Sequence, residues 1–141
     1  MAGEVKNYNP GKYILIAGSI PIKGFANGTF ISIASISDAV TSQAGADGEI
    51  ARAISADKRK RITITLQHTS DSNSVLNGFA SADSASGAGI MFPLYAQDLL
   101  GSDKFAVAQA WVQKKPDREF GTDIGNRVWV IETGEPSIDL L

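Results

Sequence analysis

The sequence predicts a mainly β fold, an antiparallel β-sandwich or partial barrel of about seven strands with one short helix. Three observations support this prediction. Residues 61–67 alternate strictly between polar and apolar side chains, as expected of a strand with one solvent-exposed face. Turn residues recur about every eight to twelve positions, a spacing typical of sandwiches and barrels. Alternating strand and helix patterns, which would favour a parallel α/β sheet, do not occur in the sequence.

Composition indicates a single domain over residues 1–141, with a flexible arm at 1–11 and a tail at 134–141. The chain has no cysteine and one histidine, which excludes disulfides, thiolate metal sites and cysteine nucleophiles. We expect no cofactor and no bound metal. The net charge of −2 gives no general attraction to nucleic acid. Apolar runs are far shorter than the ~20 residues that span a bilayer, so we expect no membrane anchor.

The first half of the chain predicts a β-hairpin with strands at 13–25 and 29–37. Asn27-Gly28 supplies the positive-φ residues of its tight turn. We expect residues 38–48 to form a long loop, which in a compact domain is usually functional or mobile. A short strand follows at 50–55.

The next strand, 61–68, has an inner row of Ile62, Ile64 and Leu66. Its polar row is Thr63, Thr65 and Gln67, on the face expected to be exposed.

The second half predicts one helix and three strands. Thr69, Ser70 or Asp71 caps a helix of about ten residues, and a loop follows at 81–89. In the long strand, Phe105, Val107 and Trp111 are expected on one face and alanines on the other. The three strands are predicted at 90–97, 104–113 and 126–132.

Candidate reaction centres have simpler structural explanations. His68 lies beside Ser70 and Asp71, but the members of a catalytic triad converge from separate segments, so a strand-end histidine is favoured. Asp38, Asp47 and Glu49 are too few for a calcium loop. An enzyme is therefore the weakest interpretation.

Two further features have open alternatives. The basic cluster at 58–61 either contacts nucleic acid or forms a solvated or partner-facing turn, and no regularly spaced aromatic residues accompany it. Trp111 and Trp129 are either core or interface anchors or a platform for sugars.

Short motifs in a fixed order carry a resemblance to a known family. The chain resembles the tail tube proteins of contractile-tailed bacteriophages, a family of phage structural proteins first known from a Pseudomonas phage. This family is similar in fold to the tube subunits of type VI secretion. The motifs are Gly45–Arg52, Ile62–Asn73, Phe92-Pro93-Leu94, Ala110-Trp111-Val112, Lys115-Pro116-Asp117 and Asn126-Arg127-Val128-Trp129.

The resemblance implies a structural subunit of the virion tail, assembled in the host cytoplasm. Six subunits form a ring, rings stack into a hollow tube, and each subunit gives strands to a barrel that lines the lumen. The implied partners are further copies of the chain, the tail sheath protein, and baseplate and tail terminator proteins. The tape measure protein and the DNA occupy the lumen transiently.

The functional residues implied by the resemblance are contact residues. Loop 38–48 and arm 3–11 are expected between stacked rings, and the cluster at 58–61 is expected to face away from the lumen. The polar row Thr63, Thr65 and Gln67 either lines the channel or contacts a neighbouring subunit. The strand expected to line the lumen includes Thr29, Ile31, Ile33 and Ser35. The charges expected at subunit interfaces are Asp38, Asp47, Glu49, Arg52, Asp117, Arg118 and Glu119.

Two other functions stay open at this point. A baseplate tube-initiator or adaptor would share the fold but would close rings without indefinite stacking. A carbohydrate-binding β-sandwich would present aromatic side chains on an exposed face.

Overall fold

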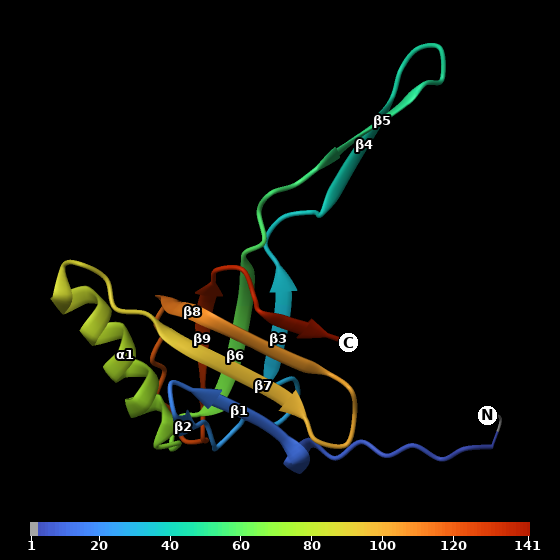
Figure 1. Cartoon of the computed structure of the whole chain (residues 1–141). Coiled ribbons are helices and arrows are strands. Elements are labelled where there is room, and N and C mark those ends of the chain that lie inside the picture. The colour runs from blue at the N-terminus through green and yellow to red at the C-terminus, as the bar shows by residue number, and fades with distance from the viewer. Residues whose placement is uncertain (1–2) are drawn as a thin grey trace.

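The computed structural model describes residues 3–141 and shows a β-sheet body from which a hairpin projects (Figure 1). In chain order the elements are η1 (Pro10–Lys12), β1 (Tyr13–Ala17), β2 (Ile20–Pro21), β3 (Ile31–Ser35), β4 (Val40–Ala44), β5 (Ile50–Ile54), β6 (Lys60–Gln67), α1 (Ser72–Ser86), β7 (Phe92–Asp98), β8 (Lys104–Lys114), β9 (Asn126–Thr133) and β10 (Ile138–Leu140).

The body is one antiparallel sheet in the order β2-β1-β7-β8-β9-β6-β3, with β10 also paired to β8. β1, β7 and β8 form one layer and cross in front of β9, β6 and β3, while α1 runs along one side (Figure 1). β8 belongs to both layers because its first part pairs with β7 and its last residues pair with β9. The sheet does not close, so the predicted antiparallel, mainly β fold with one helix is confirmed as an open, folded-over sheet.

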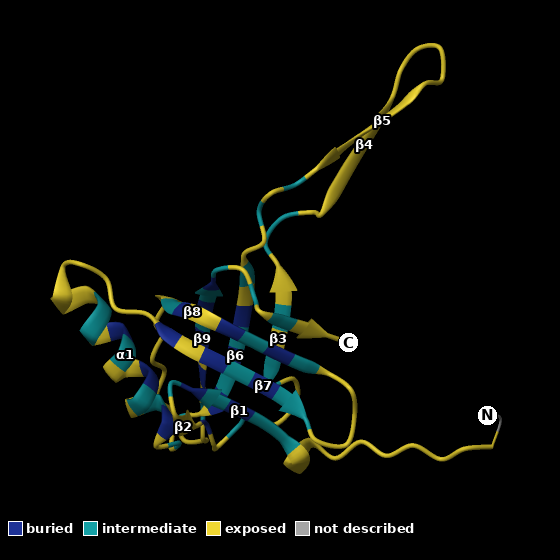
Figure 2. Ribbon diagram, viewed as in Figure 1, coloured by how far each residue is buried: buried dark blue, intermediate teal, exposed yellow. Residues whose placement is uncertain are grey.

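The core lies between the two layers (Figure 2). The predicted inner row of β6 is confirmed, since Ile62, Ile64 and Leu66 are at most 1% exposed. Leu15 and Leu94 meet this row from the other layer. Alternation therefore identified the correct face of this strand.

Helix α1 is longer than predicted. Residues 81–86, expected in a loop, continue the helix, which ends where Gly87 takes the left-handed conformation at φ 68°. Leu76 is buried on the sheet, and the ring of Phe79 stacks on Phe92 with centroids 4.4 Å apart. Serine and alanine are compatible with this helix because packing of its inner face holds it in place. Among the described residues, no helix is long and apolar enough to cross a membrane.

The predicted hairpin between 13–25 and 29–37 is wrong. β1 pairs with β7 and with the short β2, whereas β3 pairs with β6 at the far end of the sheet. After Gly18 (φ 66°) the chain turns tightly into β2, and then crosses the body. A turn signal alone does not tell which strands pair, because pairing also depends on burial of both faces.

The predicted loop 38–48 is mostly regular structure. Its residues form β4 and the turn that leads into β5, so this segment and the predicted strand at 50–55 make a two-stranded hairpin. Gly45 N–H donates to Glu49 O at 2.7 Å, and Gly48 takes φ 88° in the turn. Gly48 fixes the turn because few other residues adopt this conformation without strain.

Strands β8 and β10 also differ from expectation. Phe105 and Val107 face the core as predicted, but Trp111 does not share their face, because the pairing of β8 with β7 shifts between Leu94 and Phe92. Such a bulge reverses the alternation, so Ala110 is the buried residue. The segment predicted as a C-terminal tail contains β10, which pairs with β8.

Candidate assembly surface

The hairpin formed by β4 and β5 is the first candidate surface. Every residue of both strands is exposed, and the ribbon projects far from the body (Figures 1 and 2). Val40 lies opposite Ile54 and Ala44 lies opposite Ile50, so four of the six side chains on one face of the ribbon are apolar. Ile50 and Ile54 are 71% and 74% exposed. An isolated two-stranded hairpin is only marginally stable in water, so this face fits a surface that another molecule covers.

Arg52 belongs to the same apolar face, opposite Ser42. Asp47 lies in the turn, where its Oδ1 accepts a hydrogen bond from the Glu49 N–H at 3.1 Å. Asp38 lies at the root of the hairpin. Four of the seven predicted interface charges therefore lie on the hairpin, and all four are exposed.

The other three predicted interface charges, Asp117, Arg118 and Glu119, lie in the irregular segment between β8 and β9. All three are exposed, and Asp117 pairs with Lys114 at 3.9 Å. Phe120 in the same segment is 80% exposed. Within one subunit this segment and the hairpin are separate surfaces, so a contact between their charges would need two copies.

The outer face of β9, β6 and β3 is the second candidate surface. Its side chains are small and mostly uncharged: Thr63 lies between Ser32 of β3 and Val130 of β9 in the pairing register. The next row contains a charged pair, in which Arg61 Nη2 lies 3.5 Å from Glu132 Oε1. The two charges offset each other, so this face has little net charge.

The edge of β3 is the third candidate surface. Phe30 O accepts a hydrogen bond from Thr65 N–H, and Ile36 N–H donates to Arg59 O, both on the β6 side. Because backbone direction alternates along a strand, Ile31, Ile33 and Ser35 direct their N–H and C=O groups to the free edge. Such an edge is a template for another strand.

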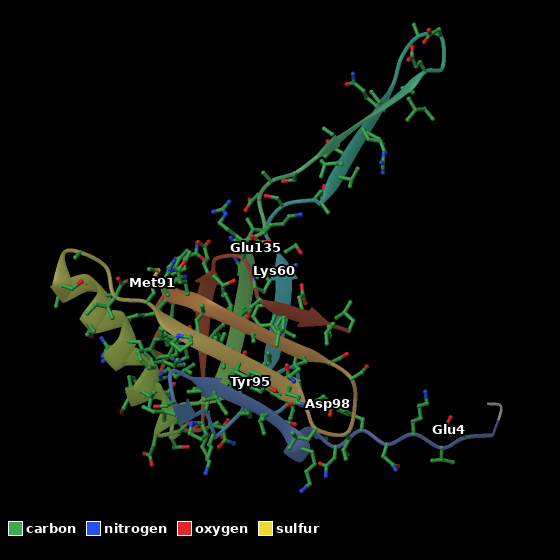
Figure 3. The ribbon with its side chains drawn as sticks, viewed as in Figure 1. Glu4, Lys60, Met91, Tyr95, Asp98 and Glu135 are labelled. Carbon is green, nitrogen blue, oxygen red and sulfur yellow. The ribbon has the colours of Figure 1, made fainter. Side chains whose placement is uncertain are left out.

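A cavity of about 610 Å³ lies beside this edge, between β3 and the strands β8 and β10. Ile31 and Ile33 line it and also pack against the core. Lys60 lies at the cavity near the root of the hairpin (Figure 3), donates to Ser35 Oγ at 2.7 Å and pairs with Asp139 of β10 at 3.3 Å. On the outer face of β3, the exposed side chains are those of Ser32 and Ala34.

The basic cluster at 58–61 is largely neutralised. Arg59 pairs with Asp57, Lys60 with Asp139 and Arg61 with Glu132. The hydrogen bond from Arg59, followed by the one from Ser37, holds the pKa of Asp57 well below its usual range. This arrangement fits a solvated, structured turn better than a phosphate-binding site.

The contacts of His68 hold two segments of the chain together. Its Nδ1 accepts a hydrogen bond from the Gly125 N–H at 2.9 Å, and its ring lies edge-on to Phe120. This contact ties the end of β6 to the segment before β9. Among residues 3–141, no group of three or more His, Asp or Glu side chains is placed to hold a metal ion.

Two features of these surfaces were not predicted from the sequence. The apolar face of the hairpin was missed, although Val40, Ser42 and Ala44 alternate with Thr41 and Gln43 in a strand pattern. The link between Ser37 and Asp57 was also missed, because residues twenty positions apart give no local signal.

Comparisons with known proteins agree with a tube-forming fold. The sequence profile of a family described as bacteriophage PhiTE tail tube protein matches residues 17–141. Structural protein ORF10 of Pseudomonas phage KPP10 is 28% identical over 138 residues, covering 93% of this chain and 80% of that protein.

Solved structures with this fold have low sequence identity. The tube-terminating cap of the anti-feeding prophage is 9% identical with a TM-score of 0.66, covering 100% of this chain and 96% of that one. A chain of the extended sheath-tube complex of PVC, an extracellular contractile injection system, is 11% identical with a TM-score of 0.62. That match covers 96% of this chain and 93% of the other. These likenesses show the fold.

Proposed function

Since the chain belongs to the bacteriophage PhiTE tail tube protein family and is a structural subunit of a phage tail tube, we propose how it builds that tube. Six copies form a ring by strand pairing, and rings stack through the β4–β5 hairpin. The uncovered outer face of β9, β6 and β3 lines the lumen. The observation that carries this proposal is that one sheet combines an uncovered, nearly uncharged face with open strand edges.

Ring closure uses two open edges of the same sheet. The free edge of β3 is one, with the backbone groups of Ile31, Ile33 and Ser35. The other is the end of β8, because β7 pairs with β8 only as far as Ala110, whereas β9 continues to Lys114. β3 and β8 run in opposite directions across the sheet, so β3 of one copy meets β8 of the next as an antiparallel pair. Such a head-to-tail contact closes a ring and leaves neither of these two edges open.

A lumen formed by this face suits the passage of DNA. Each lysine or arginine that neutralises a phosphate adds affinity, which would retain the DNA. The rows Ser32–Thr63–Val130 and Thr65–Val128 carry no charge, and Arg61 is paired with Glu132. Within β3, Ser32 and Ala34 face the lumen, while Ile31 and Ile33 serve the core. The polar row of β6 is thereby assigned to the lumen and not to a contact with a neighbouring subunit.

The remaining partners follow from the position of the tube in a contractile tail. We propose that the tail sheath protein surrounds the outside of the tube and that baseplate and terminator proteins bind its two ends. The tape measure protein and DNA occupy the lumen in turn. The chain has no catalytic role in this scheme. The hairpin charges Asp38, Asp47, Glu49 and Arg52 and the exposed arm serve contacts between rings.

Electron microscopy of the purified full chain tests this proposal. Long hollow tubes with six subunits per ring are expected. A Ser35→Pro variant removes one free-edge N–H of β3 while keeping the bonds to β6, so it is expected to stay folded and lose ring closure. Ser35→Ala is the matched control, since it loses the same hydroxyl but keeps the N–H. Tubes formed by Ser35→Pro as readily as by Ser35→Ala would contradict the strand pairing, and isolated rings from the unchanged chain would indicate an adaptor.

A further inference from the structure

The hairpin does not continue the β3–β6 pair in register. Ser35 lies opposite Lys60 in the body, whereas Val40 lies opposite Ile54 in the hairpin. The outgoing leg, residues 36–39, therefore has four residues, and the returning leg, residues 55–59, has five. The extra residue interrupts the ladder at the root of the hairpin. The direction of the ribbon is consequently decided by contacts between the two legs.

Two backbone hydrogen bonds join the legs, one at each end. Ser55 N–H donates to Ala39 O at 2.9 Å, and Ile36 N–H donates to Arg59 O at 3.3 Å. Between these points the two legs are free of ladder bonds. A pair of strands held in this way can bend and twist about its root, as ribbons of two strands readily do.

Asp57 bridges the gap between these two points. Its Oδ2 accepts a hydrogen bond from Ser37 Oγ of the opposite leg at 2.6 Å. Its Oδ1 and Oδ2 accept bonds of 2.9 Å from Arg59 Nε and Nη2, in a two-pronged pair. Oδ1 also accepts from the Arg59 backbone N–H at 3.1 Å. Among the described residues, the Ser37–Asp57 bond is the one side-chain bond that joins the two legs.

The bridging carboxylate is itself immobilised. The Asp57 N–H donates to Ser55 Oγ at 3.1 Å, so both ends of the residue are fixed within the returning leg. An ordinary exposed ion pair contributes little, partly because two long side chains must be ordered. Here the backbone already holds Asp57 and Arg59 close together, which lowers that entropic cost. The low pKa of Asp57 keeps the carboxylate ionised throughout the neutral range.

We propose that Asp57 is a positioning residue that fixes the direction of the β4–β5 hairpin through Ser37 and Arg59. The hairpin is thereby held ready to meet its partner before the partner arrives. Pre-ordering of a binding segment reduces the conformational entropy lost on binding. The effect on hairpin direction stands independently, and its consequence for ring stacking rests on the proposed function.

The test measures hairpin direction in the unassembled full chain. The chain has no cysteine, so Gln43→Cys on the hairpin and Gln109→Cys on β8 provide two unique sites for spin labels. Both positions are exposed. Pulsed electron paramagnetic resonance on dilute protein then gives the distribution of distances between them. A single narrow distribution is expected for the parent.

Three variants of the bridge and one control are compared with this parent. Asp57→Ala removes the whole bridge, and Ser37→Ala removes only the bond between the legs, so both are expected to broaden the distribution. Arg59→Lys keeps a positive charge but loses the two-pronged pair, and an intermediate width is expected. Asp123→Ala, which removes an exposed carboxylate between β8 and β9, is the control and should leave the distribution unchanged. Parent-like widths in both Asp57→Ala and Ser37→Ala would overturn the proposal.

Tube formation by the unlabelled chains distinguishes the effect of Asp57 on hairpin direction from its consequence for ring stacking. Slower elongation by Asp57→Ala, with an unchanged melting temperature, supports the positioning role. Elongation at the parent rate despite a broadened distribution would overturn the link to stacking. If the unchanged chain forms no tubes at all, the proposed function fails, while the resonance result still decides the role of Asp57.

Discussion

The indole Nε1 of Trp129 donates a 2.9 Å hydrogen bond to Oδ1 of Asn73. Trp129 is 3% exposed and belongs to β9, whereas Asn73 lies in the first turn of α1. The amide of Asn73 also donates to the carbonyl oxygens of Gln67 at 2.9 Å and Ser70 at 3.0 Å. One side chain therefore joins the start of the helix to β9 and to the end of β6.

Asn73→Ala is expected to lower the free energy of unfolding by about 1–3 kcal/mol, because it leaves the buried Trp129 N–H without its acceptor. Denaturant unfolding of the full chain measures this change. Asn77→Ala, on the exposed side of the same helix, is the control for helix propensity. Equal values for the two variants would mean that the Trp129 bond adds nothing.

Gly24 and Gly28 separate backbone strain from steric clash. Both have positive φ, at 77° and 91°. A Cβ on Gly24 would lie 2.5 Å from Ser70 Oγ, whereas a Cβ on Gly28 would have no heavy atom within 4 Å. Gly28→Ala is expected to cost about 1 kcal/mol of unfolding free energy, and Gly24→Ala clearly more. Similar losses in thermal or chemical unfolding would contradict the close approach of Ser70 to Gly24.

Tyr13 predicts how stability changes at alkaline pH. Burial, followed by the charges of Asp103 and Asp98, raises the pKa of Tyr13 above its ordinary value. The folded chain thus favours the neutral phenol, and this contribution is complete below about pH 10 and lost as pH rises through the folded-state pKa. Absorbance at alkaline pH should show a late-ionising phenol that is missing in Tyr13→Phe. The free energy of unfolding of Tyr13→Phe should fall less steeply than that of the parent above about pH 10. An unchanged titration curve would contradict the raised pKa of Tyr13.

The lumen face predicts an effect on DNA retention. Thr63→Lys with Thr65→Lys adds two positive charges per subunit to this face, so assembled tubes should hold short DNA fragments in a salt-dependent manner. Ser84→Lys with Ser81→Lys adds the same charge on the exposed side of α1 and is the control. Co-sedimentation of tubes with labelled DNA measures retention. Equal retention by both sets of tubes would exclude the assignment of the face to the lumen.

Substitutions on the apolar face of the hairpin are expected to block assembly without unfolding the subunit. Ile50→Ser with Ile54→Ser should change the free energy of unfolding by no more than about 0.5 kcal/mol, because both side chains are already exposed in the subunit. Tube elongation, followed by light scattering and microscopy, should be lost. Ala51→Ser with Ala53→Ser alters the opposite face of the same strand and should leave elongation intact. Normal elongation by the isoleucine variant would show that this face is not a contact.

Local patterns predicted the elements with the strongest alternation. The inner row of β6 and the positions of β8 and β9 followed from side-chain period, because burial on one face requires that period wherever a strand covers a core. The end of α1 was missed because serine and alanine permit both helix and loop. The change of face at Trp111 was missed because a bulge needs one extra residue and leaves no separate signal in the side-chain pattern.

The candidate surfaces were also predicted only in part. Exposed charges were predicted in segments 38–52 and 117–119, since charged side chains are mostly exposed, but the hairpin that carries the first group was not predicted. The sequence did not show that Ile31 and Ile33 pack on the core while Ser32 and Ala34 face outward, because both rows of that strand are compatible with a half-buried edge.

By itself, the sequence determined that the chain forms an antiparallel sheet with one helix and, because it has no cysteine, that disulfides and thiolate sites are excluded. Only the tertiary structure decided which strands pair, which edges stay open and where the β4–β5 hairpin points. The physical reason is the range of the interactions. Alternation and turn preference act over a few residues, whereas the contacts of Asp57 with Ser37 and of Asn73 with Trp129 join residues that meet only when the sheet has folded.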